Sequence, residues 1–324
     1  MKLCTFEVHT QLGRHRRLGA VTAGGIVDLN FAYAAYLAGQ GERRPQKVAD
    51  VLLPANMLEF LQAGAMARAV QAIEAAVAAE GPGLNGETLL YAPGCGRGEA
   101  RLLAPLPNPA SVRDFYAFES HVKAAFEKRG EPMPQEWYEM PVYYKSGHHH
   151  ILGTDQDVRW PSFTEKFDYE LELAAVIGEA GRNIPAGEAH KHIAGYTVMN
   201  DFSARDIQRR EMKVRLGPAK GKDWATAIGP YLITPDEVGD PYNLAMTARV
   251  NGEIWSEGNS RSIHWTFAQM IEFLTRDDEI VPGDLIGSGT VGAGCGLELD
   301  RWVKRGDVME LEIEKIGKLR NRAV

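Results

Sequence analysis

The sequence predicts an α+β protein, with a β-rich mixed-sheet domain over residues 111–324 and a small mixed α/β domain over residues 1–110. From residue 169 onward, strand-like runs alternate with glycine- and proline-rich turns, which disfavours a doubly wound parallel sheet. Asn251-Gly252 separates two apolar runs and predicts a hairpin, because a type I′ turn needs positive φ at both positions. Three prolines at alternate positions within residues 104–110 force extended backbone and mark a connector between the two domains.

The small domain is expected to form short strands followed by helices. Its strand-like runs cover residues 2–8, 18–21 and 25–29. Helices are expected over residues 45–53, 56–62 and 65–79, where Ala, Leu, Glu and Gln dominate, as helix propensity favours. Gly81-Pro82-Gly83 is expected to end the last helix, since neither residue type continues one.

The larger domain is expected to be mostly strands. The second half of residues 112–126 looks helical, and residues 130–137, with two prolines, look like a long mobile loop. Strands are expected over residues 170–178, 195–201, 231–234, 245–250, 284–288 and 308–313. One helix, over residues 266–275, is expected to interrupt them.

Composition excludes several classes of function. The 324 residues hold 43 acids and 36 bases, a formal charge of -7, which argues against a nucleic-acid binder. The N-terminus has no apolar core typical of a secretory signal, and polar residues interrupt the most apolar stretch, residues 63–79, so no membrane span is expected. The 3 cysteines are scattered and suit neither a disulfide framework nor a zinc knuckle; we expect free thiols in a cytoplasmic protein.

Two glycine-rich segments do not qualify as nucleotide sites. Residues 287–292 match G-x-G-x-x-G, but the following Ala-Gly-Cys-Gly will not start the helix that a dinucleotide needs. Residues 217–223 lack the Ser or Thr that follows the lysine of a P-loop. The run of three histidines at residues 148–150 is expected to be a solvated loop, and the sequence assigns it no role.

Paired acids on one expected strand carry the chemical signal. Glu170 and Glu172 alternate with leucines, so both project to one side, about 7 Å apart along the strand. Asp168 begins the same polar row. A solvated strand face is one interpretation, but the strand continues into a run that looks buried on both faces, where unpaired charge is costly. A hard divalent cation is the simplest counter-charge, and Asp201 and Asp114 could complete its site, although periodicity alone does not show that the four acids meet.

Taken together, these segments resemble the fumarylacetoacetate hydrolase family over residues 110–324, with a weaker N-terminal extension like that of its longer members. Six ordered motifs carry the resemblance: residues 114–116 with His121, then 169–173, 199–208, 217–222, 287–290 and 296–299. The resemblance implies the fold of that family's C-terminal domain. It also implies a homodimer, an expectation that the exposed edges of β-rich domains favour independently.

The resemblance also implies a role for particular residues. The implied metal ligands are Asp114, Glu170, Glu172 and Asp201, holding a divalent cation, with Mg²⁺ first and Mn²⁺ or Ca²⁺ as alternatives. His121 and Glu298 match the pair that activates water, and Lys222 and Thr226 match a lysine and a threonine beside the metal, of which the lysine can stabilise an oxyanion. The implied substrate contacts are Tyr116, Tyr144, Arg205, Gln208 and Thr290.

The function that this resemblance implies is metal-dependent hydrolysis of a C–C bond in acylpyruvate-type 2,4-diketo acids, with a small 2-keto acid as the only expected partner besides a second copy. Met212 stands where longer hydrolases carry a tyrosine, which argues against fumarylacetoacetate itself as substrate. Ala124 stands where shorter members place an acid, which leaves Glu298 as the partner of His121 and favours hydrolysis over decarboxylation. Residues 130–137 are then expected to act as a lid.

Two alternatives stay open at this stage. One is a decarboxylase of oxaloacetate, or a hydratase or isomerase of 2-keto-enoic acids, on the same metal site. The other is a non-catalytic binding protein whose fold a metal stabilises. The acyl group, the physiological metal and the pathway are not determined by the sequence.

Overall fold

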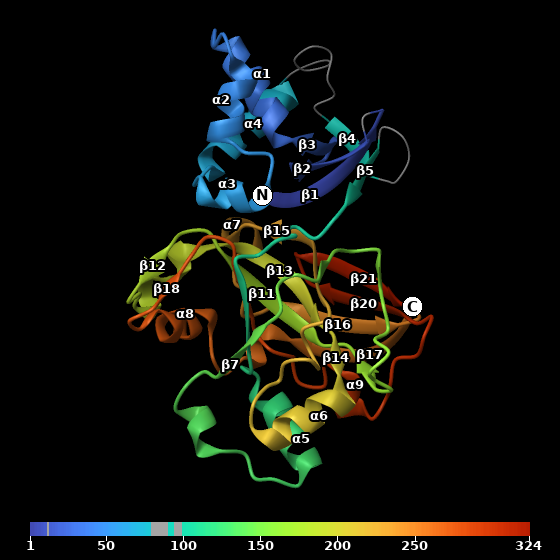
Figure 1. The fold of residues 1–324 in the computed structure, drawn as a ribbon. Helices are drawn as coiled ribbons and strands as arrows, with labels where there is room; N and C mark the ends of the chain where they lie inside the picture. Colours follow the sequence, from blue (N-terminus) through green and yellow to red (C-terminus); the bar gives the residue numbers. More distant parts are fainter. Residues whose placement is uncertain (12, 79–89, 94–98) are drawn as a thin grey trace.

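The computed structural model describes residues 1–11, 13–78, 90–93 and 99–324 (Figure 1). The chain mixes helices with β-sheet, as the sequence predicts; it has two large sheets, and parallel and antiparallel strand pairs both occur. In Figure 1 the N-terminal helices and strands lie at one end of the molecule, and α5 (Glu119–Arg129) and α6 (Arg205–Val214) lie at the other.

The N-terminal part contains a ring of strands. Its strands are β1 (Lys2–Thr10), β2 (Gly13–Thr22), β3 (Gly25–Asp28), β4 (Leu90–Pro93) and β5 (Glu99–Leu102). They follow the order β2-β3-β4-β5-β1, and β1 also pairs with β2, which closes the ring. The three strands predicted before residue 30 are confirmed.

Four helices pack beside this ring: α1 (Leu29–Gly39), α2 (Pro45–Leu52), α3 (Met57–Gln62) and α4 (Met66–Ala78). The last three match the predicted helices to within a residue or two. The first was not predicted, because its apolar residues surround it almost completely and leave no amphipathic stripe to detect. Its start is marked by Asp28, whose carboxylate accepts the backbone N–H of Phe31. The helix end predicted at Gly81 lies outside the described residues.

The main sheet continues from this ring into the larger part of the chain. From β1 it passes through β15 (Thr226–Ile233), β13 (Ile193–Asp201), β11 (Leu171–Ile177), β19 (Asp284–Gly287), β6 (Ser111–Phe115) and β7 (Tyr143–Ser146), with β8 (Ile151–Leu152) beside β15. The first residues of β1 pair with the end of β15, so backbone hydrogen bonds cross the division expected near residue 110. The division into two domains therefore stays a prediction.

A second, five-stranded sheet packs against the first. Its order is β17 (Glu253–Asn259), β16 (Ala245–Val250), β20 (Val308–Ile313), β21 (Gly317–Ala323) and β9 (Gln156–Val158). The predicted hairpin is confirmed: β16 pairs with β17, and Asn251 and Gly252 have φ of 52° and 82°. Two short pairs complete the strands, β10 (Phe167–Asp168) with β14 (Ser203–Ala204) and β12 (Gly181–Arg182) with β18 (Glu279–Ile280).

The larger part holds more helix than predicted. The expected helix is confirmed as α8 (Phe267–Thr275), which Thr266 begins with a capping box. The expectation of a single helix among the strands is wrong, because α6, α7 (Pro235–Val238) and α9 (Gly296–Leu299) also occur, with 3₁₀ turns η2 (Gln135–Tyr138), η3 (Ala186–His192) and η4 (Ser260–Ser262). Helix α6 escaped detection because most of its residues are charged or polar, so it shows no apolar stripe.

The alternation along β11 explains how the sheet is covered on both faces. Leu171 and Leu173 belong to the core shared with the second sheet, whereas Ala174 and Val176 pack against the N-terminal helices. Glu172 has the same parity as Ala174, and so lies on the face toward the N-terminal helices but nearer the other end of the strand. Within the described part of the chain, no helix is both long and apolar enough to cross a bilayer.

Candidate active site

Four buried carboxylates from three segments of the chain meet at one place. Each of Asp114, Glu170, Glu172 and Asp201 offers an oxygen within 4.8 Å of those of the others. Their exposed fractions are between 0% and 5%. Glu170 and Glu172, which alternation placed on one side of a strand, therefore lie together with Asp114 and Asp201, which the sequence could only suggest.

Strand register brings these acids together. Asp114 on β6 lies beside Gly287 on β19, and Gly287 lies beside Ala174, two residues after Glu172. Asp201 ends β13, the strand that flanks β11 on the other side. Gly287 is required here, because a Cβ at this position would lie 2.3 Å from Oδ1 of Asp114 and 3.1 Å from Oε2 of Glu172.

The cluster carries more negative charge than its surroundings compensate. Burial, together with the neighbouring acids, raises the pKa of Asp114 and Glu172 well above their ordinary values. Burial also raises the pKa of Asp201, although Lys222 opposes the rise. Glu170 differs: burial would raise its pKa, but Lys222 and Arg205 hold it below its usual range.

Lys222 is the cation nearest to the cluster. Its Nζ lies 2.5 Å from Oε2 of Glu170 and 2.5 Å from Oδ2 of Asp201. Tyr144 donates its hydroxyl to the same oxygen of Asp201. Thr226, beside Asp201 across the β13–β15 pair, is buried. Burial alone would lower the pKa of Lys222, but the carboxylates raise it, so the lysine is a fixed positive charge here.

The residues present fit a divalent cation. Among the described residues, Oε2 of Glu172, Oδ1 of Asp201 and Oγ1 of Thr226 are buried without a hydrogen-bond partner. Buried polar atoms normally have partners, so two unpaired carboxylate oxygens in one cluster mark a place for a cation. Because every donor is an oxygen, the cluster suits a hard cation such as Mg²⁺, Mn²⁺ or Ca²⁺.

A histidine–carboxylate pair lies next to the acids. His121 on α5 has its Nδ1 2.6 Å from Oε1 of Glu298 on α9, and both side chains are buried. The backbone N–H of Ala293 donates to the other oxygen of Glu298 at 2.9 Å. Since an ionised carboxylate only accepts hydrogen bonds, Nδ1 carries the proton and Nε2 is left free to act as a base.

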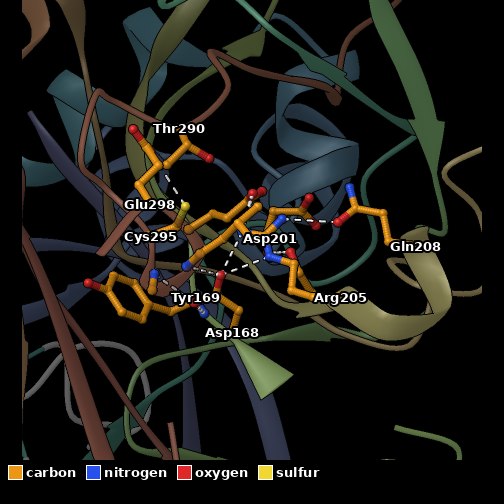
Figure 2. Close-up of polar contacts among 12 residues, drawn as sticks. Asp168, Tyr169, Asp201, Arg205, Gln208, Thr290, Cys295 and Glu298 are labelled. Atoms are coloured by element: carbon orange, nitrogen blue, oxygen red, sulfur yellow. Dashed lines mark hydrogen bonds and ion pairs between the residues drawn. The ribbon is translucent and has the colours of Figure 1, made fainter. Parts of the chain in front are cut away.

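Arg205 is the first residue of α6, and its side chain faces the cluster of acids (Figure 2). Its Nη2 lies 2.8 Å from Asp168 and 2.8 Å from Glu170, and its Nη1 donates to Oε1 of Gln208 at 3.1 Å. Figure 2 shows the guanidinium between Asp168 and Gln208. The guanidinium that the sequence assigned to a substrate carboxylate is thus held rigidly beside the cluster.

The remaining predicted residues also lie here. Thr290 donates to Oε1 of Glu172 at 3.4 Å, and the ring of Tyr116 meets that of His121 edge-on at 5.2 Å. The expected lid is anchored at its far end, where Trp137 is buried and donates its indole N–H to the carbonyl of Tyr116 at 2.7 Å. For residues 130–136 the lid stays a prediction.

Two residues near the site received no role from the sequence. Asp168 lies outside the cluster of four carboxylates and bonds Arg205 and the backbone N–H groups of Gly296 and Leu297. Cys295 lies with its Sγ 3.5 Å from Oε1 of Glu298. Alternation placed Asp168 in the polar row but indicated no partner for it, and a lone cysteine in a glycine-rich loop gave no signal.

Known proteins resemble this chain in sequence and in fold. The family model for the fumarylacetoacetate (FAA) hydrolase C-terminal domain matches residues 110–324. The human mitochondrial oxaloacetate tautomerase FAHD2A is 31% identical over 326 residues, covering 100% of this chain and 92% of that protein.

Among solved structures, a putative HpcE protein from Mycobacterium smegmatis superposes with a TM-score of 0.72 at 26% identity, covering 100% of this chain and 99% of that one. Fumarylpyruvate hydrolase from Pseudomonas aeruginosa, in complex with Mn²⁺ and pyruvate, superposes with a TM-score of 0.59 at 27% identity, covering 69% of this chain and 91% of that one. With the matched model spanning most of its length, this chain belongs to the fumarylacetoacetate hydrolase family.

Proposed function

We propose that this protein is a metal-dependent enzyme of 2-oxo acids in which His121, held by Glu298, moves a proton to or from the substrate. The observation that carries the proposal is the short Nδ1–Oε1 contact of 2.6 Å beside a buried cluster of four carboxylates. A base held by a carboxylate and adjacent to a cation site is suited to substrates that gain or lose a proton next to a carbonyl.

The metal would be held by Asp114, Glu170, Glu172 and Asp201. When bound, a divalent cation supplies Lewis-acid polarisation of a carbonyl oxygen. The chain's own residues do the rest. Arg205 is placed to pair with a substrate carboxylate, because guanidinium geometry matches a carboxylate and this guanidinium is already oriented by Asp168. Glu298 keeps the ring of His121 in one tautomer, so that Nε2 exchanges the proton.

The reaction we propose first is interconversion of the enol and keto forms of oxaloacetate. In the direction of the enol, Nε2 takes a proton from C3 and then gives it to the 2-oxo oxygen; the reverse transfer restores the ketone. No bond between carbons breaks, so a single positioned base and a cation suffice. Relatives named oxaloacetate tautomerase, which match this chain from end to end, support this choice.

The second reaction we propose is hydrolysis of an acylpyruvate. Here Nε2 takes a proton from water, the hydroxide adds to the distal carbonyl, and the C–C bond breaks with its electron pair on C3 of the pyruvate part. The proton then returns to C3, leaving pyruvate and a carboxylic acid. The histidine–glutamate pair is the feature that favours this reaction, and Lys222 is the cation available for the oxyanion.

One assay with product detection separates these reactions. The purified protein with Mg²⁺ or Mn²⁺ is given oxaloacetate freshly dissolved as its enol, and separately acetylpyruvate. Tautomerisation removes the enol absorbance without forming pyruvate, decarboxylation forms pyruvate and CO₂ from oxaloacetate, and hydrolysis forms pyruvate and acetate from acetylpyruvate. No acceleration with either substrate and either metal would defeat the proposal.

Variants test the assigned roles. Replacing His121→Asn should lower turnover by about 10²–10⁴-fold, the usual contribution of a general base. The same variant should keep its thermal stabilisation by Mg²⁺, because the carboxylates are intact. The matched control is His190→Asn, at an exposed histidine on η3 that contacts none of the site residues described above. Unchanged turnover in His121→Asn would show that another group moves the proton.

A further inference from the structure

Cys295 is a buried thiol that the proposed reaction does not use. It precedes α9 and is 0% exposed. Its Sγ lies 3.5 Å from Oε1 of Glu298, the same oxygen that meets Nδ1 of His121 at 2.6 Å. Figure 2 shows the sulfur directed at the Glu298 carboxylate. One donor atom from each of these three residues lies within 4.8 Å of the other two.

We propose that His121, Cys295 and Glu298 form a second metal site, specific for a borderline-soft cation such as Zn²⁺. Its donors are sulfur, nitrogen and oxygen, a set that Zn²⁺ accepts in tetrahedral geometry. Three protein ligands leave the fourth position for water. The neighbouring cluster of four carboxylates offers only oxygen and so favours hard cations. The two sites therefore select different metals.

The scaffold around these donors is rigid. Cys295 pairs through its backbone with Glu170, and the next two N–H groups, of Gly296 and Leu297, both donate to Asp168 at 2.8 and 2.9 Å. The backbone is thus held at Cys295 and at the two residues that follow it, while α5 carries the imidazole. A site on a fixed scaffold binds metal without reordering the chain.

Solvent lies close to the three donors. Ala293, whose N–H donates to Glu298, is exposed, so the protein surface lies one hydrogen bond from the carboxylate. A cation arriving here replaces the hydrogen bond between His121 and Glu298: the proton on Nδ1 moves through solvent to Nε2, and the thiol proton leaves to solvent as sulfur binds. Because the imidazole then ligates the metal, it no longer serves as a base. Zn²⁺ at this site is therefore an inhibitor of the reaction proposed above.

Cobalt spectroscopy tests the site without any activity. The full-length protein is saturated with Mg²⁺ to fill the carboxylate cluster and then titrated with Co²⁺, which gives an intense near-ultraviolet charge-transfer band only when a thiolate is a ligand. We expect the band in the wild type and in a Cys4→Ala, Cys95→Ala double variant, where Cys295 is the remaining thiol. We expect no band in Cys295→Ser or Cys295→Ala, with folding checked by circular dichroism.

Inhibition by zinc gives the second readout, and it rests on the proposed function. At fixed Mg²⁺, the Zn²⁺ concentration for half-inhibition should rise at least about tenfold in Cys295→Ser. Loss of a residue that merely supports a ligand already lowers metal affinity by about tenfold or more, and Cys295 is a ligand in this proposal. Each variant is compared with its own zinc-free rate. A band without turnover on any 2-oxo acid keeps this site and defeats the proposed function. Absence of the band in the wild type, or its survival in both Cys295 variants, overturns the second site.

Discussion

At the scale of single residues, strand alternation was enough to pair Glu170 with Glu172, because side chains two apart on a strand share a face. The same rule put Asp168 at the start of this row but named no partner for it; Asp168 bonds groups 37 and 128 residues further along the chain. Such a partner is chosen by tertiary packing and leaves no trace in the local pattern. Asp114 and Asp201 could only be suggested from the residues, and the resemblance to a family supplied them as ligands together with His121 and Glu298.

We expect Asp168 to support both the stability of the fold and the binding of substrate by Arg205, and one substitution can separate these two roles. In Asp168→Asn the amide can no longer accept from both the guanidinium of Arg205 and the two backbone N–H groups. We expect the free energy of unfolding to fall by roughly 3 kcal/mol, the order seen when one partner of a buried ion pair is lost. We also expect KM for a 2-oxo acid to rise more than kcat falls, because Arg205 is the group left misplaced. Chemical denaturation and steady-state kinetics measure these two effects.

The control for Asp168→Asn is Asp157→Asn. Asp157 also makes a two-point pair with an arginine, Arg322, but both side chains are about half exposed. Exposed pairs contribute little, so stability and KM should both stay close to wild type. If Asp168→Asn loses stability yet keeps its KM, the aspartate supports the fold without positioning Arg205 for substrate.

At the scale of elements, local signals located most strands and the helices with strong caps or clear composition. The turn at Asn251-Gly252 and the capping box of α8 are such signals, since their chemistry is contained within a few residues. Helices α1 and α6 were not predicted, for opposite reasons: α1 is apolar nearly all round, whereas α6 is mostly charged or polar. The order of strands was not predictable, because pairing of β6 with β19 joins segments about 170 residues apart.

The pairing of β6 with β19 makes Gly287 a sensitive point. Its substitution to alanine needs no unusual backbone, but the added Cβ would lie 2.3 Å from Oδ1 of Asp114. We expect Gly287→Ala to displace this carboxylate and weaken Mg²⁺ or Mn²⁺ binding about 10–100-fold, the range for disturbing a ligand's support. Calorimetric titration measures the affinity directly.

Gly252→Ala is the matched control for this variant. Gly252 has φ of 82°, and a Cβ there would meet nothing within 4 Å, so its cost is backbone strain alone, about 1–2 kcal/mol. It should lose stability and keep its metal affinity. A Gly287→Ala protein that binds Mn²⁺ as tightly as wild type would show that Asp114 is not a ligand.

At the scale of the whole molecule, both sheets leave edges for another chain. The main sheet ends at β7 and the second sheet at β17 and β9 among the described strands, and unpaired edges favour association. At the C-terminal end of α6, Val214 and, two residues later, Leu216 are 77% and 82% exposed, which is unusual for large apolar side chains. We predict a homodimer of about 71 kDa, twice the 35.7 kDa of the chain. Light scattering after gel filtration measures the mass, and a value near 36 kDa at micromolar concentration would contradict it.

The charge of the buried cluster also makes the stability of the whole protein depend on pH and metal together. Burial raises the pKa of Asp114, Glu172 and Asp201, so the metal-free folded state holds protons that the unfolded chain releases above about pH 4. Each of these groups therefore contributes stability that is present at low pH and lost as pH rises through its raised pKa. Glu170, with a lowered pKa, acts in the opposite sense, but only below about pH 4.

Between pH 5.5 and 8 we therefore expect the metal-free protein to lose stability as pH rises, whereas a bound divalent cation takes the place of the protons. A ligand at 100-fold its Kd stabilises the folded state by roughly 2.7 kcal/mol at any one pH. In addition, the difference in Tm between the Mg²⁺-loaded and the EDTA-treated protein should widen as pH rises. In Glu172→Gln the metal-free protein should become more stable at pH 8 and lose its response to Mg²⁺, since a neutral amide removes both the repulsion and the ligand. Differential scanning fluorimetry across this pH range measures both Tm values. A difference in Tm that narrows toward pH 8 would mean that these acids do not hold the metal.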